Sequence, residues 1–217
     1  MKALSIVDEQ AMDNPVKINA IRSNQSWMIS ISIADQANEI FVAHSGNAPK
    51  STGFMAGTIS QTTGKPLPYP LIELPAHAEK TLLGISYQDI HGKMQGPFEI
   101  DFDPEMALVA GQKDLLERLS QSWLAYGEYD GGKIVYFTAL LSYRCALTEI
   151  KYSFGNDELD QSFPLDPCDP TNPHAVTAKN GVPTIFVAVP KGTEFTAVQL
   201  SYKDGTQSEL NRFKIVR

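Results

Sequence analysis

The chain has 217 residues, of which 42% are hydrophobic, and its 18 Lys and Arg against 25 Asp and Glu give a formal net charge of −7. Nucleic-acid binding depends on basic side chains that neutralise phosphates, so this acidic balance excludes DNA or RNA as the expected main partner. No apolar run approaches the ~20 residues of a membrane helix, and the N-terminus lacks the apolar stretch of a signal peptide. We therefore expect a soluble protein without membrane insertion, cytoplasmic if the chain is complete and extracytoplasmic if an export signal has been removed.

Strand signals follow in two matched sets along the chain. The first set comprises residues 27–33, 38–43, 69–74, 82–88 and 98–102. The second set comprises residues 133–141, 148–154, 184–189, 197–203 and 212–216. Alternation of apolar and polar residues in these segments predicts half-buried strands. The sequence therefore predicts an all-β protein.

A helix is predicted between the two sets. Asp103 is a candidate N-cap, and Pro104 suits the first helical position. Leu119 and Trp123 belong to a group of leucine and tryptophan residues that recur at helical spacing, which predicts an amphipathic helix over residues 103–126. Because such an apolar stripe needs a surface to cover it, we expect it to pack on one or both domains, to bury Trp123 and to restrict their relative motion.

The last third of the chain matches residues that lie 115 positions earlier. The match pairs Pro68, Pro75, Glu79, Thr81, Ser86, Tyr87, Asp89, Phe98 and Ile100 with Pro183, Pro190, Glu194, Thr196, Ser201, Tyr202, Asp204, Phe213 and Ile215. A repeat of this kind indicates one structural unit that is used twice. We predict a first β domain over residues 1–102, a helical linker over 103–130 and a second β domain over 131–217.

Both repeats end with a strand, a proline, a turn, a strand containing Ser-Tyr-x-Asp, another turn and a final strand. This ending, over residues 68–102 and 183–217, resembles the closing strands of fibronectin type III and related immunoglobulin-like domains. The resemblance implies two tandem immunoglobulin-like or fibronectin III-like β-sandwiches. Because the shared Ser-Tyr pair places the same strand face inward, we expect Tyr87 and Tyr202 to be buried at equivalent positions.

Two interpretations of the cysteines are open. Cys145 and Cys168 are either independent thiols, with Cys145 a small buried residue in a strand, or a disulfide. A disulfide would tie a strand to the loop that follows it and would persist only in an oxidising compartment.

The segment 156–174 combines acidic residues with four prolines. Its candidate partner-binding residues are Asp157, Glu158, Asp160, Asp166, Asp169 and His174. Three interpretations are open: a solvated loop stiffened by proline, a loop that contacts a partner, or a Ca²⁺ site, since Ca²⁺ prefers carboxylate oxygens. Glu39 and Ile40 match Glu149 and Ile150 at a spacing of 110, whereas the later residues match at 115, so the second repeat has about five more residues between these positions. We therefore expect any functional difference between the repeats to lie in this loop.

Motifs of catalysis do not occur in the chain. It has no Gly-x-Ser-x-Gly turn, no glycine-rich phosphate loop, no His-Glu-x-x-His and no zinc-ligand spacing. We predict that the chain is not an enzyme and has no cofactor or metal. We predict a binding or scaffold protein with a protein partner, and leave open the interpretation that it is part of a larger multidomain protein. The alternative is a carbohydrate- or surface-binding accessory module of an exported protein, and an enzyme with an inter-domain cleft ranks third.

Two structural features would separate the first two hypotheses. An apolar groove or an unpaired edge strand would favour a protein partner. A flat aromatic patch on one sheet would favour a sugar, although aromatic residues on half-buried strands usually belong to the core. The candidates for such a patch are Tyr69, Tyr136, Tyr143, Tyr152, Phe154 and Phe163.

Overall fold

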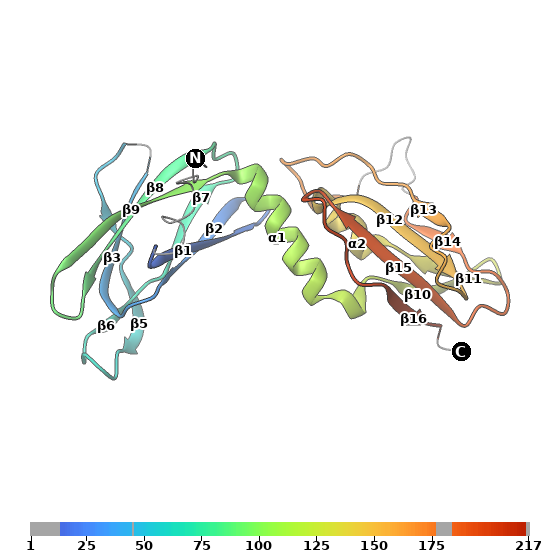
Figure 1. Cartoon of the computed structure of the whole chain (residues 1–217), viewed down its shortest axis with the longest axis horizontal. Helices are drawn as coiled ribbons and strands as arrows, with labels where there is room; N and C mark the ends of the chain where they lie inside the picture. Colours follow the sequence, from blue (N-terminus) through green and yellow to red (C-terminus); the bar gives the residue numbers. More distant parts are fainter. Residues whose placement is uncertain (1–13, 45, 177–183, 216–217) are drawn as a thin grey trace, which may run out of the picture. The chain divides into compact units, whose positions relative to one another are not determined.

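The computed structural model describes residues 14–44, 46–176 and 184–215. The chain divides into two compact units, residues 1–107 (unit 1) and 108–217 (unit 2). Both units consist mainly of antiparallel strands (Figure 1). Over the residues that are described, no helix is long and apolar enough to cross a membrane.

Unit 1 contains two antiparallel sheets and a hairpin. The three-stranded sheet has the order β1-β2-β7, formed by β1 (Val16–Arg22), β2 (Ser26–Ile33) and β7 (Leu71–Pro75). The four-stranded sheet has the order β4-β3-β8-β9, formed by β4 (Lys50–Ser51), β3 (Ala37–His44), β8 (Thr81–Asp89) and β9 (Met94–Phe102). The hairpin pairs β5 (Phe54–Ile59) with β6 (Pro66–Pro68).

Alternation along β2 builds one wall of the core of unit 1. Trp27, Ile29 and Ile31 are each at most 5% exposed. Met28 lies between them in the sequence and is 52% exposed, as expected for the opposite face of the strand. The ring of Trp27 meets Phe102 edge to face, with 5.4 Å between the ring centroids.

Unit 2 also contains a three-stranded and a four-stranded sheet. The first has the order β10-β11-β14, formed by β10 (Ala125–Tyr129), β11 (Gly132–Tyr136) and β14 (Phe186–Ala188). The second has the order β13-β12-β15-β16, formed by β13 (Gln161–Phe163), β12 (Leu147–Phe154), β15 (Phe195–Tyr202) and β16 (Asn211–Lys214). The helical elements are α1 (Pro104–Arg118), which crosses the division between the units, α2 (Thr138–Ser142) and the 3₁₀ turns η1 (Ser120–Ser122) and η2 (Arg144–Ala146).

Aromatic side chains fill the core of unit 2. Trp123 is 1% exposed, and its indole Nε1 donates a hydrogen bond of 2.8 Å to the carbonyl oxygen of Leu116. Phe213 lies 6.1 Å from Trp123 between ring centroids. Phe137 stacks on Phe163 with a centroid distance of 4.2 Å, so a residue after β11 packs directly on a residue of β13.

The two units share the same strand order. In unit 1, β7 pairs with β2, while β8 lies between β3 and β9. In unit 2, β14 pairs with β11, while β15 lies between β12 and β16. Tyr87 and Tyr202 lie on the corresponding strands β8 and β15, and both are 2% exposed, which confirms their predicted burial.

The helix predicted over residues 103–126 is shorter than expected and ends at Arg118. Strand β10 follows it and pairs with β11, so part of the predicted linker belongs to a sheet of unit 2. The indole of Trp123 reaches back to the carbonyl of Leu116 and satisfies an acceptor that the end of the helix leaves unpaired. Trp123 is buried as predicted, but Leu119 is 45% exposed, so its predicted packing is wrong.

The strand predicted over residues 133–141 is also shorter, because β11 ends at Tyr136 and α2 follows. Phe137, Leu140 and Leu141 are all at most 5% exposed. Their spacing of three and four positions is that of one helical face. A short apolar run is compatible with either a strand or a helix, and here tertiary packing of this face selects the helix.

Candidate functional site

The proline loop (residues 156–174) does not gather its predicted contact residues. Asp157 pairs with Arg212 of β16, whose Nε donates a hydrogen bond of 2.8 Å to Asp157 Oδ1. Asp169 accepts hydrogen bonds from the backbone N–H and the hydroxyl of Thr171, at 2.9 and 2.6 Å. These donors hold the pKa of both carboxyl groups below its usual range.

The remaining acidic candidates of the proline loop are separate from these two. Glu158 and Asp160 are exposed, and Asp166 is half-buried. No three His, Cys, Asp or Glu side chains in the described ranges are placed to hold a metal ion together. The Ca²⁺ interpretation therefore has no ligand cluster in this part of the chain. Within the same loop β13 pairs with β12, and Phe163 is 3% exposed, so the loop is in part a strand of the core.

A disulfide fixes the second half of the proline loop. Cys145 and Cys168 are bonded, which joins η2 to the loop and leaves no thiol among the described cysteines. Cys145 is fully buried, whereas Cys168 is half-buried. Because Cys168 is bonded to Cys145, it is not a free thiol nucleophile.

A buried arginine is a second clamp on this loop. Arg144 is 4% exposed, and its guanidinium donates to the carbonyl oxygens of Pro167 at 3.2 Å and Pro173 at 3.5 Å. A third hydrogen bond, of 3.1 Å, goes to the carbonyl of Leu141. Sequence reasoning missed this role, since nothing in the local pattern separates a clamping arginine from a surface one. His174 completes the contact, with its Nδ1 3.1 Å from the carbonyl oxygen of Ser142.

A concave surface with a mainly apolar lining lies instead on unit 1. A groove of about 310 Å³, here called the unit 1 groove, lies between the turn that joins β2 to β3 and the β5–β6 hairpin. Its apolar lining includes Ile31, Ile33, Ile40, Met55, Leu67 and Ile90. Gln36 from the turn donates to the hydroxyl of Thr62 at 3.4 Å, which connects the two sides.

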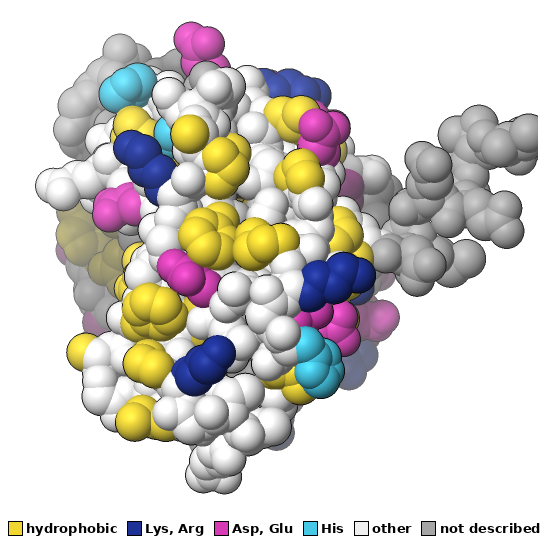
Figure 2. Space-filling model, turned by 90° about the vertical axis from the view of Figure 1, so that its left-hand side faces the viewer, with side chains coloured by type: hydrophobic (Ala, Val, Ile, Leu, Met, Phe, Trp, Pro, Cys, Tyr) yellow, Lys and Arg dark blue, Asp and Glu magenta, His cyan; other side chains and the backbone are white. Residues whose placement is uncertain are grey.

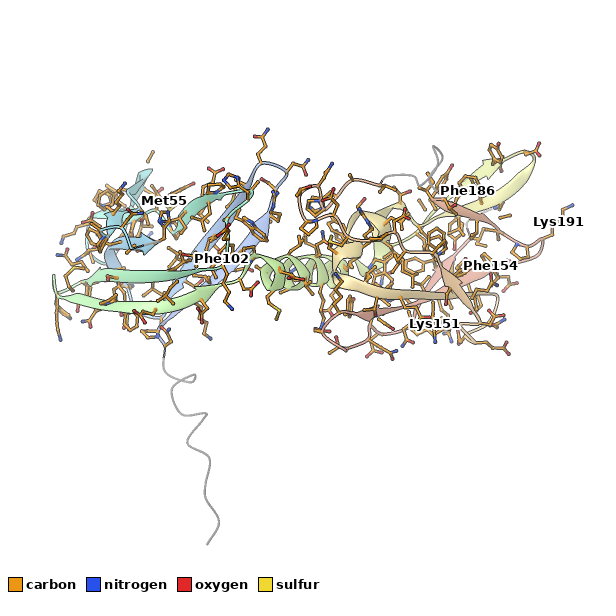
Figure 3. All side chains as sticks on the ribbon, turned by 90° about the horizontal axis from the view of Figure 1, so that it is seen from above. Met55, Phe102, Lys151, Phe154, Phe186 and Lys191 are labelled. Carbon is orange, nitrogen blue, oxygen red and sulfur yellow. A yellow bond between two sulfur atoms is a disulfide. The ribbon has the colours of Figure 1, made fainter. Side chains whose placement is uncertain are left out.

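Exposed apolar side chains occur in and next to the segments that line the unit 1 groove. Phe54, Met55 and Ile59 of β5 are between 37% and 61% exposed, and Tyr69 and Ile90 are 42% and 41% exposed. Figure 2 shows hydrophobic side chains spread over one face of the molecule with charged side chains among them, and Figure 3 marks Met55 on β5. Apolar surface costs about 25 cal/mol per Å² when it is left in water. Clustered exposed apolar residues beside a groove are typical of a binding surface.

One carboxylate lies in the unit 1 groove. Asp35 is exposed, and its Oδ2 accepts a hydrogen bond of 3.1 Å from the hydroxyl of Tyr87. Tyr87 is 2% exposed and stacks on Phe98 with 6.0 Å between ring centroids. Burial, followed by the hydrogen bond to Asp35 and the charges of Asp35 and Asp89, raises the pKa of Tyr87. The hydroxyl therefore stays protonated at neutral pH and holds the carboxylate in place.

Unit 2 carries a second surface feature, a cluster of three aromatic rings on the sheet β10-β11-β14. This aromatic cluster comprises Tyr129, Tyr136 and Phe186, with centroid distances of 5.8 Å from Phe186 to each tyrosine. Gly127 makes room for it, because a Cβ there would lie 3.0 Å from the ring of Tyr136. Tyr129 is 65% exposed, and Phe186 is marked in Figure 3.

The aromatic cluster agrees only in part with the predicted sugar-binding face. Tyr136 belongs to it, whereas Tyr152 and Phe163 are buried in the core of unit 2. Tyr129 and Phe186 were not predicted. They come together because β10 and β14 flank β11, a pairing between distant parts of the sequence.

Neither a scan against protein-family models nor a search of curated proteins finds a match to this chain.

Proposed function

We propose that the chain is a non-catalytic binding protein built from two tandem β-sandwich domains of immunoglobulin-like or fibronectin III-like plan. The common order of a three-stranded and a four-stranded sheet in both units supports this plan. The nine sequence identities at a constant spacing support an origin by internal duplication. In this proposal the sandwiches are the scaffold, and function lies in the surfaces on which the two units differ.

The partner in this proposal is a protein, and the unit 1 groove is its binding site. The observation that carries the proposal is the groove itself, with an apolar lining and with the exposed side chains of β5 beside it. Apolar pockets with a few polar groups are the usual form of ligand sites. A volume of about 310 Å³ suits a few side chains of a peptide segment.

The disulfide indicates the kind of compartment in which this binding protein would function. Disulfides persist outside the reducing cytosol, so the Cys145–Cys168 bond supports function in an oxidising environment. In this proposal the chain is an exported module.

A random nine-residue peptide library displayed on phage tests the proposed site. We expect the full chain to select peptides, and we expect Met55→Glu and Ile90→Glu to abolish their binding, because each puts a charge into the apolar lining. Met28→Glu is the matched control, since Met28 is 52% exposed on a different face of unit 1. Selection of no peptide, or equal loss with Met28→Glu, would refute a peptide site in the groove.

A second candidate function is carbohydrate binding at the aromatic cluster of unit 2. The exposed ring of Tyr129 beside Phe186 favours it, because aromatic faces offer large apolar contact area next to a polar hydroxyl. Retention on insoluble polysaccharides should fall for Tyr129→Ala and stay unchanged for Tyr69→Ala, which removes an exposed tyrosine from unit 1. Absence of retention by the unmodified chain on a broad glycan array would remove this candidate.

A further inference from the structure

We propose that the peptide bound by the unit 1 groove carries a basic side chain beside its apolar residues, and that Asp35 receives this charge. The inference rests on the proposed function and adds to it the chemistry of the partner. Its basis is the placement, orientation and charge of a single carboxylate.

Among the residues that the structure describes, Asp35 is the one charged residue that lines the unit 1 groove. Its carboxylate forms no ion pair with any residue of the described chain. The neighbouring lining is aliphatic, contributed by Ile33 and Ile90 among others. A charge at an apolar surface interacts more strongly with an opposite charge than it would in open water, because the effective dielectric constant is lower there. Charge complementarity therefore favours a cationic group on the partner.

The carboxylate is also held in one orientation. Tyr87 donates to Oδ2 at 3.1 Å, which leaves Oδ1 without a hydrogen bond among the described residues. The ring of Tyr87 is packed in the core, so the donor does not need to be ordered when a ligand binds. The adjoining turn is fixed by a hydrogen bond of 2.8 Å from the N–H of Ala34 to the carbonyl of Pro15. Preorganised groups of this kind reduce the entropy cost of binding.

The second unit lacks this feature. The residue that corresponds to Asp35, at the spacing of 110 that relates Glu39 to Glu149, is Cys145, which is bonded to Cys168. Tyr202, the counterpart of Tyr87, has a buried hydroxyl with no hydrogen-bond partner in the part of the chain that is described. The carboxylate and its tyrosine donor therefore occur together only where the groove lies.

A lysine or arginine side chain satisfies the geometry. Its aliphatic stem can lie along the apolar lining while its charged end reaches the carboxylate. Charge-assisted hydrogen bonds are about twice as strong as neutral ones, so this contact is expected to dominate the polar part of recognition. The apolar residues of the same peptide would fill the remainder of the groove.

The test uses the peptides selected by the full chain from the nine-residue library. We expect them to combine apolar residues with Lys or Arg, and we expect replacement of that residue by citrulline to weaken binding about tenfold in fluorescence polarisation, or 1.4 kcal/mol. Asp35→Asn should remove the difference between the two peptides, and Asp35→Lys should favour glutamate in place of the basic residue. Asp101→Lys makes the same change of net charge at an exposed position of β9 outside the groove, and should leave the preference unchanged.

The outcomes separate this inference from the proposed function. The inference would be overturned if Met55→Glu abolishes binding of the selected peptides but these peptides show no preference for a basic residue. The groove would then remain a peptide site. An equal effect of Asp101→Lys and Asp35→Lys would also overturn it, since net charge alone would then explain the preference. Selection of no peptide at all would defeat both. Because Asp35 is exposed, circular dichroism of the Asp35→Asn variant should show an unchanged fold.

Discussion

Tyr87 and Tyr202 lie on corresponding strands, but their hydroxyl groups have different surroundings. The hydroxyl of Tyr87 donates to Asp35, whereas that of Tyr202 has no partner in the described ranges. The ammonium group of Lys113 lies 5.0 Å from the ring centroid of Tyr202 and forms an ion pair of 2.6 Å with Asp204. A shared sequence pair thus fixes the burial of both rings, while the residues contributed by other elements decide the chemistry of each hydroxyl.

Tyr202 should make unit 2 sensitive to alkaline pH. Burial, with added repulsion from Glu117 and Asp204, raises the pKa of Tyr202 to about 12. Because the folded-state pKa exceeds the unfolded value of about 10, the associated stability is complete below pH ~10 and is lost as pH rises through the folded pKa. We expect the melting temperature to fall less between pH 9.5 and 12 in Tyr202→Phe than in the unmodified chain, as measured by circular dichroism. Tyr129→Phe, at an exposed position, should behave like the unmodified chain, and an identical decline in all three proteins would contradict this prediction.

Trp123 should be the most costly side chain to truncate in unit 2. It is 1% exposed and donates to the carbonyl of Leu116. We expect Trp123→Ala to lower the free energy of unfolding by about 3–5 kcal/mol in urea titrations, the usual range for a large-to-small core change. Trp123→Phe should cost about 1–3 kcal/mol, because it leaves the carbonyl unpaired. Leu119→Ala, at a position that is 45% exposed, should stay within about 0.5 kcal/mol, and a larger loss there would show that Leu119 packs after all.

At the scale of elements, the proline loop is held by covalent and polar contacts, not by strand pairing alone. Only β13 joins it to a sheet, and the following residues depend on the Cys145–Cys168 bond and on the guanidinium of Arg144. Buried charged groups require hydrogen-bond partners, and here backbone carbonyls of the loop supply them. The loop and Arg144 therefore stabilise each other.

Removing the disulfide should weaken unit 2 without unfolding it. The cysteines are 23 residues apart, and loop-closure entropy for that length corresponds to about 3 kcal/mol. We expect Cys168→Ser to lower the free energy of unfolding by about this amount in urea titrations. Backbone hydrogen exchange should accelerate in the loop after Pro164 but not in β12. The loop should remain partly held, because Arg144 still binds the carbonyls of Pro167 and Pro173. Addition of Arg144→Lys should release the loop further, and no additional exchange in the double variant would mean that the arginine is not a clamp.

Local patterns predicted most strands of the two main sheets in each unit and the buried tyrosines. They did not predict β1, β5, β10 and β13, the ends of several elements or the surfaces. Alternation in β2 was sufficient, because one face of that strand is buried. The strand β10 and the helix α2 were missed, since both form only when the core of unit 2 packs together. The unit 1 groove was missed for the same reason: Asp35 and Met55 are ordinary loop and strand residues until the β5–β6 hairpin and β3 come together.

At the scale of the whole molecule, each unit has a core of its own and one tryptophan within it. The chain contains two tryptophans, Trp27 in unit 1 and Trp123 in unit 2, which are 2% and 1% exposed. The core cluster of unit 2 consists of residues between Leu116 and Phe213, all within that unit. A domain with its own hydrophobic core is expected to fold as a unit. Whether the helix restricts motion between the domains, as the sequence predicts, is therefore separate from the stability of each domain.

Tryptophan fluorescence can follow each unit by itself. With Trp27→Phe the emission reports only Trp123, and with Trp123→Phe it reports only Trp27, because no other tryptophan is present. We expect Leu141→Ala, a core change in unit 2, to shift the urea midpoint reported by Trp123 and to leave the midpoint reported by Trp27 within error. Ile29→Ala in unit 1 should have the reverse effect, since Ile29 is fully buried there. If each core change moves both midpoints together, the two units unfold as one, and α1, the continuous helix that crosses their division, becomes the element through which they are coupled.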